Sequence, residues 1–182
     1  MKNNVKFLMI GAIMAISVSA CKKDTPLPDV NEEELITTLT LKFTNTANSS
    51  DVRVFTSKDL DGDGGNPPQN QTITLAANST YNVELTELLN ETTNPAGNIL
   101  AEVEEESDEH LFVYKPTGNL TINVTDKDAN NLPVGIKSSA VTTSAGNASL
   151  TVILRHQPDG AKNGTETPGE TDTERLFNVT IQ

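Results

Sequence analysis

The sequence predicts an all-β protein, an immunoglobulin-like antiparallel β-sandwich of about seven to nine strands with at most one short helix. Apolar and polar residues alternate with a period of two along most of the chain after residue 34. Clusters of Gly, Pro, Asn and Asp separate the alternating segments, and Thr and β-branched residues are frequent within them. Period-two alternation is typical of strands that bury one face, so two packed sheets are the expected architecture.

The first half of the chain supplies the clearest strand patterns. Residues 35–43 place Leu39, Leu41 and Phe43 on one face, and residues 80–89 place Tyr81, Val83, Leu85, Glu87 and Leu89 on one face. Further strands are expected at residues 52–55, 72–75 and 99–103.

The second half contains the one predicted helix, a short one over residues 102–109. Strands are expected at residues 111–114, 120–124, 134–141, 150–154 and 177–181. A long polar stretch, residues 158–173, lies between the last two strands and is expected to be a mobile or functional loop.

Composition excludes several classes of protein. The 182 residues contain 13 basic and 25 acidic side chains, a formal net charge of -12, and one cysteine. One cysteine cannot form a disulfide framework, a zinc ribbon or an iron-sulfur site. A strongly acidic chain repels phosphate, so no nucleic-acid partner is expected.

The N-terminal residues 1–20 have the three zones of a secretory signal. A basic start precedes an apolar run over residues 7–16, which is too short to span a membrane, and a small-residue end. Val18-Ser19-Ala20-Cys21 resembles the lipobox of bacterial lipoproteins. In that family the cysteine is diacylated, the signal is removed before it, and its amino group is acylated. The alternative is an ordinary signal peptide followed by a chance cysteine.

The resemblance implies that Cys21 anchors the protein in a membrane through its acyl chains, which together bind firmly. Residues 21–34 then form an acidic, proline-containing tether, and residues 35–182 form the β-sandwich domain. A flexible tether of this length spans roughly 20 Å, so the domain is expected close to the membrane.

An Asp-rich loop matches the opening of a calcium-binding motif. Asp59, Asp61 and Asp63 alternate before Gly64, and alternate carboxylates can converge on a hard cation. The twelfth position is Asn70 instead of a bidentate Glu, and the flanking segments are predicted strands, so the loop is not an EF-hand. It is either a calcium-binding loop between strands or a connection solvated by its own charges.

The two histidines form the second candidate metal site. His110 ends an acidic run in which Glu106 lies four residues earlier, a spacing that shares a face in both helices and strands. His156 ends a predicted strand close to Asp159. Two imidazoles with Glu106 or Asp159 would suit zinc or copper, provided that the histidines lie within about 5 to 7 Å of each other. The alternative is two exposed histidines in unrelated places.

Nothing in the sequence predicts catalysis. It contains no G-x-S-x-G, H-E-x-x-H, P-loop or dinucleotide motif, and acylation would leave no free thiol. An enzyme would need a concave pocket with convergent acids, so we expect a protein that is not an enzyme.

Four features together resemble a family of small lipoproteins of Gram-negative bacteria: the lipobox, the Asp-Gly loop, the Glu-rich run ending in HLFVY, and the segment RHQPDG at residues 155–160. Some members carry the label type 1 periplasmic-binding fold superfamily. The resemblance covers nearly the whole mature chain and implies an outer-membrane lipoprotein, accessory to an uptake system and its outer-membrane protein. It carries no functional residues. The period-two pattern itself predicts a sandwich, not the alternating strands and helices of a periplasmic-binding fold.

Two functions follow from the sequence. The first is a non-catalytic, lipid-anchored module that binds a partner at the cell envelope through residues 158–173 and the Asp59 loop. The alternative is a lipoprotein that binds a divalent metal, zinc or copper, through His110, His156 and nearby acids, with calcium as a structural ion in the Asp59 loop.

Overall fold

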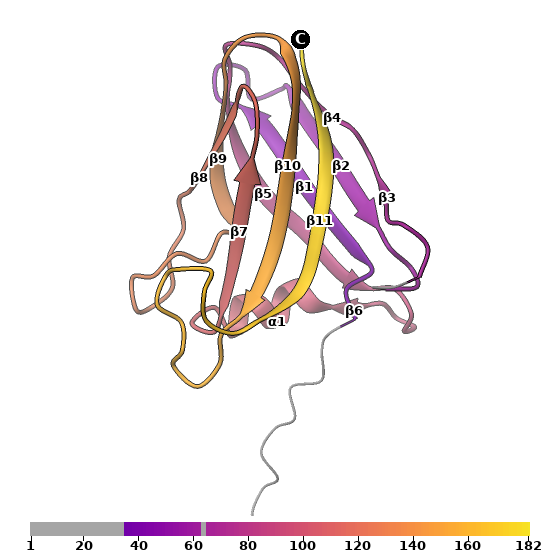
Figure 1. Ribbon diagram of the computed structural model, residues 1–182, viewed down its shortest axis with the longest axis vertical. Coiled ribbons are helices and arrows are strands. Elements are labelled where there is room, and N and C mark those ends of the chain that lie inside the picture. The colour runs from indigo at the N-terminus through magenta and orange to yellow at the C-terminus, as the bar shows by residue number, and fades with distance from the viewer. Residues whose placement is uncertain (1–34, 63–64) are drawn as a thin grey trace, which may run out of the picture. The chain divides into compact units, whose positions relative to one another are not determined.

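The computed structural model describes residues 35–62 and 65–182 (Figure 1). The predicted signal, Cys21, the tether and Asp63 lie outside the described residues. Within the described part, no helix is long and apolar enough to cross a membrane.

Two β-sheets face each other and confirm the predicted all-β sandwich (Figure 1). The larger sheet has the order β3-β2-β1-β5-β9-β8, with β6 paired to β5, and the smaller has the order β4-β11-β10-β7. The strands are β1 (Thr38–Asn45), β2 (Val52–Lys58), β3 (Gln69–Asn70), β4 (Ile73–Leu75), β5 (Thr80–Asn90), β6 (Gly97–Asn98), β7 (His110–Pro116), β8 (Leu120–Val124), β9 (Lys137–Thr142), β10 (Gly146–His156) and β11 (Glu170–Ile181). Nine of these match predicted strands, and the other two, β3 and β6, have only two residues each. The β4–β11 pairing is parallel, whereas the other strand pairings are antiparallel.

The core lies between the sheets and is built from the alternating apolar residues. Strand β1 contributes Leu39, Leu41 and Phe43, and the facing sheet contributes Leu150 and Phe177, all fully buried. Phe43 also meets the ring of Tyr81 edge to face at 6.2 Å between ring centroids. Burial of these side chains supplies the main driving force for the sandwich.

Strand β5 departs from the predicted alternation after Leu85. Its pairing with β1 shifts register at Thr40 and Leu41, which face Glu87 and Leu85 and leave one extra residue, Thr86, between them. The shift reverses the parity of the strand, so Leu88 is buried and Glu87 is exposed. The prediction that Glu87 and Leu89 continue the buried face is therefore wrong, because of this β-bulge.

The predicted strand at residues 99–103 is wrong, since α1 (Ile99–Glu105) occupies these residues. The side-chain oxygen of Asn98 accepts a hydrogen bond from the Ala101 amide at 3.4 Å and caps the first turn. Ile99 and Val103, four residues apart, pack their side chains into the core. The helix also begins three residues before the predicted helix and ends at Glu105, so residues 106–109 form a turn.

The predicted loop at residues 158–173 is shorter than expected, because β11 already begins at Glu170. The loop proper runs over residues 157–169 and is held inward by its own side chains. Gln157 is buried, and its amide nitrogen donates to the carbonyl oxygens of Thr165 at 2.8 Å and Pro168 at 2.9 Å.

Candidate metal centre

The pairing of β7 with β10 brings the two histidines together. The antiparallel register places His110 directly opposite His156. Their rings stack with centroids 4.6 Å apart and an angle of 5° between the ring planes. This spacing satisfies the condition that two ligands of one metal ion must meet.

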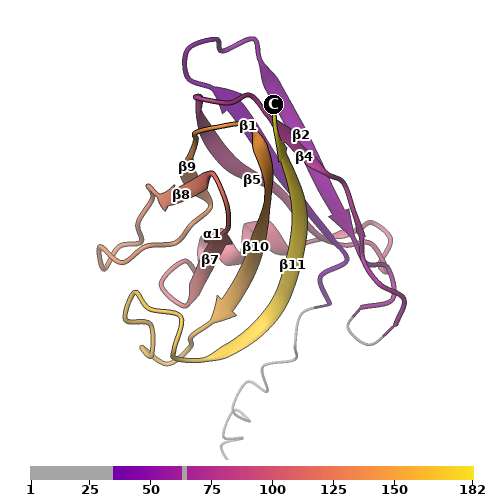
Figure 2. The same cartoon turned by 45° about the horizontal axis from the view of Figure 1, so that its top comes forward.

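Strand parity explains where the histidine pair lies. His110 has the parity of Phe112 and His156 that of Leu154, and both of these apolar residues are fully buried. The two histidines therefore lie on the inner face of the sheet, at the last residue pair of the β7–β10 pairing. There β7 begins and β10 ends close to α1 (Figure 1 and Figure 2). His110 is 3% exposed, and the His156 side chain is 13% exposed.

The end of α1 supplies the third group. Glu106 caps the C-terminus of α1, and the turn after it leads into β7. Nδ1 of His110 lies 3.0 Å from the backbone oxygen of Glu106. A carbonyl oxygen can only accept, so this hydrogen bond assigns the proton to Nδ1 and leaves the lone pair of Nε2 available. Metal-binding histidines are commonly held in this way.

The ligand atoms of Glu106, His110 and His156 all lie within 4.8 Å of one another. Ligand atoms around tetrahedral zinc are separated by roughly 3.3 Å, given bonds of about 2.0 to 2.1 Å. Binding therefore requires these atoms to approach by at most about 1.5 Å. The parallel rings must also tilt, because a metal ion lies close to the plane of each imidazole that binds it.

The charge state of His110 favours metal binding. Burial lowers the pKa of His110, whereas the hydrogen bond to Glu106 raises it. His156 and Lys162 act in the same direction as burial, and Glu109 opposes them. The net pKa is lower than usual, so the imidazole is neutral at pH 7 and can donate a lone pair.

Glu109 contacts the second histidine. Its carboxylate oxygen Oε2 lies 3.6 Å from Nε2 of His156. The backbone of Glu109 is fixed on both sides, since its amide donates to Glu106 at 2.9 Å and its carbonyl accepts from Gln157 at 2.6 Å. A carboxylate in this position can orient the imidazole, as outer carboxylates do in many metal centres.

Two further features hold the site, and the sequence patterns did not reveal either. Nζ of Lys162 lies 2.8 Å from a carboxylate oxygen of Asp128 and 2.7 Å from the carbonyl oxygen of Ser107, in the turn before His110. Gly169 lies against the backbone of His156, where an added Cβ would be 1.8 Å from the carbonyl oxygen. Only a residue without a side chain fits there, and its φ of 76° also favours glycine.

Asp159, the other acid predicted near His156, does not join the group. It lies in the turn after β10 with a φ of 58° and is exposed. Among the described residues, the group of His, Cys, Asp and Glu side chains close enough to hold a metal consists of Glu106, His110 and His156. Of the two acids predicted as partners of the histidines, the structure brings in Glu106.

In the Asp59 loop, the described carboxylates have partners within the chain. The Asp59 side chain is 2% exposed and lies 3.4 Å from the guanidinium of Arg175. The carboxylate of Asp61 accepts hydrogen bonds from the backbone of Asn66 at 2.9 Å and from its side chain at 2.7 Å, which lower the pKa of Asp61. Calcium binding here stays a prediction, with Asp63 outside the described residues.

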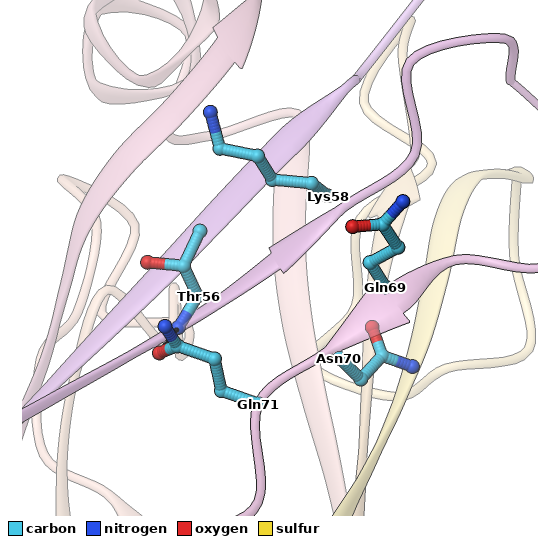
Figure 3. A pocket seen from close by; sticks show the side chains of 5 residues that line it. All are labelled: Thr56, Lys58, Gln69, Asn70 and Gln71. Carbon is cyan, nitrogen blue, oxygen red and sulfur yellow. Dashed lines mark hydrogen bonds between the residues drawn. The ribbon is translucent and has the colours of Figure 1, made fainter.

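A polar hollow of about 260 Å³ lies along β2 and β3 (Figure 3). Its lining consists of Thr56, Lys58, Gln69, Asn70 and Gln71. The Lys58 ammonium is paired with Glu91 at 3.0 Å, and Gln71 accepts a hydrogen bond from the Thr56 amide at 2.9 Å. This lining lacks the convergent acids that hydrolytic chemistry would need.

Comparison of the chain with protein-family models, curated proteins and solved structures gives no significant match.

Proposed function

We propose that this protein is a non-catalytic, lipid-anchored lipoprotein of the bacterial envelope that binds a divalent transition metal, zinc or copper, through Glu106, His110 and His156. One observation carries the proposal: the strand register pairs the only two histidines of the chain, with a carboxylate within 4.8 Å of both. Two imidazoles and a carboxylate are a ligand set that zinc and copper accept.

The surroundings of the histidines support this role. Burial keeps His110 neutral, and the Glu106 carbonyl fixes its tautomer with Nε2 available. Five of the six residues from 104 to 109 are acidic, so the local potential favours a cation over an anion.

The number of ligands favours capture or delivery over a structural role. Structural zinc sites usually have four protein ligands, whereas sites that exchange a ligand keep one position open. Here three side chains converge, and Glu106 is exposed to solvent. The core is packed from apolar residues of both sheets, and the three candidate ligands lie outside this cluster.

The predicted acylation of Cys21 indicates where in the cell envelope the metal site would lie. A lipid anchor would hold the metal site near the outer membrane, where an uptake system could receive the ion. The partner-binding role predicted for residues 158–173 and the Asp59 loop stays a prediction of its own.

Metal titration of the full-length protein in detergent micelles tests the proposal. We expect one zinc or copper ion per chain, and a stabilisation of about 2.7 kcal/mol when the free metal is 100 times its dissociation constant. His110→Ala, His156→Ala and Glu106→Gln should each weaken binding, whereas Glu104→Gln, an exposed acid of the same run, should not. Unchanged affinity in both histidine variants would contradict the proposal.

A further inference from the structure

The candidate metal centre has an incomplete ligand set. Glu106, His110 and His156 offer three ligand atoms, whereas zinc in proteins is usually bound by four. The next carboxylate, Glu109, lies beside His156 at 3.6 Å, and both ends of its backbone are hydrogen-bonded. Its position suits orientation of His156, and it lies outside the group of ligand atoms, so the fourth position is open to a ligand from elsewhere.

One flank of the site is enclosed by a buried ion pair. Behind His110, Lys162 and Asp128 form an ion pair whose side chains are 1% and 0% exposed. Lys162 also bonds the Ser107 carbonyl, which closes this side of the turn. Glu106 is exposed, whereas His110 is buried, so Glu106 gives an incoming ligand access to the site.

The chain segment around Glu106 is strongly acidic. Besides Glu106, the exposed residues of this segment include Glu104, Glu105 and Asp108. The Lys162 ammonium, which bonds the Ser107 carbonyl in this segment, is neutralised by Asp128. The formal net charge of -12 for the whole chain acts in the same direction. Anionic donors such as carboxylates and thiolates are therefore repelled, whereas a neutral donor on a basic surface is attracted.

We infer that a histidine on a basic surface of a partner protein completes the coordination of the bound metal and thereby receives it. This inference rests on the proposed function, since it needs a metal at Glu106, His110 and His156. In the step, the imidazole of the partner donates a nitrogen lone pair to the metal and a bound water leaves. The oxidation state of the metal does not change, and no proton has to move.

Two peptides test the inference with full-length protein in micelles loaded with one equivalent of copper(II). Each peptide has one central histidine, flanked by lysines in one and by glutamates in the other. The lysine peptide should bind the copper-loaded protein at least about tenfold more tightly than the copper-free protein. Electron paramagnetic resonance should then show three coordinated nitrogens instead of two.

Matched controls separate coordination from general attraction. A lysine peptide with alanine in place of histidine should lose the copper-dependent gain in affinity. The glutamate peptide should bind at least about tenfold more weakly than the lysine peptide at low salt, and the difference should shrink as salt screens the charges. The variant Glu104→Gln/Glu105→Gln/Asp108→Asn should reduce this preference and retain copper.

The outcomes distinguish the two proposals. A protein that binds copper and gains no third nitrogen from the lysine peptide would overturn this inference alone. Equal affinity for both peptides would overturn the inference that the surface of the partner is basic. Copper recovered on the lysine peptide after separation would support transfer. A wild-type protein that binds no copper or zinc would overturn the proposed function as well.

Discussion

The buried ion pair beside the metal centre gives the sharpest prediction about stability. Nζ of Lys162 lies 2.8 Å from Oδ2 of Asp128 and 2.7 Å from the Ser107 carbonyl oxygen, with both charged side chains fully enclosed. Lys162→Met keeps the length of the side chain and removes its charge, which leaves the Asp128 carboxylate buried without its cation. Breaking such a pair costs about 3 to 5 kcal/mol.

We expect the lower end of this range, about 3 kcal/mol, because the other oxygen of Asp128 keeps two backbone donors, the amides of Asn130 and Leu132 at 2.9 Å. For a domain of this size, that corresponds to a fall in melting temperature of roughly 6 to 12 °C. Urea unfolding followed by circular dichroism measures the loss. Lys127→Met, at an exposed lysine one position before Asp128, is the matched control and should cost under about 0.5 kcal/mol.

The double variant Lys162→Met/Asp128→Asn tests the cause. It removes the isolated charge, so it should be more stable than Lys162→Met alone. A loss no larger in Lys162→Met than in Lys127→Met would refute the reasoning. The reasoning would also be refuted if the double variant lost as much stability as Lys162→Met and Asp128→Asn lose separately when added together, because the effects of coupled charges are not additive.

Three further predictions follow from named contacts. Asp59→Ala should lower the free energy of unfolding by about 3 kcal/mol in urea melts, because it removes the buried carboxylate that lies 3.4 Å from the guanidinium of Arg175. A loss under about 1 kcal/mol would contradict a stabilising role for this pair. Gly169→Ala should weaken zinc affinity in titrations, since its Cβ would collide with the His156 carbonyl, whereas Gly160→Ala, where a Cβ meets nothing within 4 Å, should leave affinity intact. Burial lowers the folded-state pKa of His110 below its usual 6.5, so the unfolded chain takes up a proton at this residue more readily than the folded chain. The stability that comes from a neutral His110 is therefore complete above pH 6.5 and declines as the pH falls toward the folded-state pKa. The difference between the urea midpoints at pH 7.5 and pH 5.5 should be smaller in His110→Gln than in the wild-type protein.

Period-two alternation was sufficient to predict the sandwich, and its failures have local causes. Ile99 and Val103 share a face in a strand and in a helix, so their spacing could not distinguish the two. The Asn98 cap favours the helix over the strand, but a single capping residue is a weak signal in a sequence. At Glu87 the bulge reverses parity, and one sequence does not reveal where an extra residue is inserted.

The metal centre was predictable only in part. The sequence predicts no pairing between strands, so it left open whether His110 and His156 meet. Their contact depends on the β7–β10 register, a long-range property. The Lys162–Asp128 pair joins residues 34 positions apart within two polar loops, where no periodicity exists. An ion pair of this kind cannot be predicted from the sequence, because its two residues meet only in the folded chain.

X-ray absorption spectroscopy of the zinc-loaded, full-length protein tests the central claim most directly. The chain contains only two histidines, so counting imidazole ligands identifies the residues without mutation. The account predicts two imidazole nitrogens at about 2.0 to 2.1 Å and at least one carboxylate oxygen at a similar distance. A zinc environment of oxygen ligands alone would contradict it and place the metal among the surface acids.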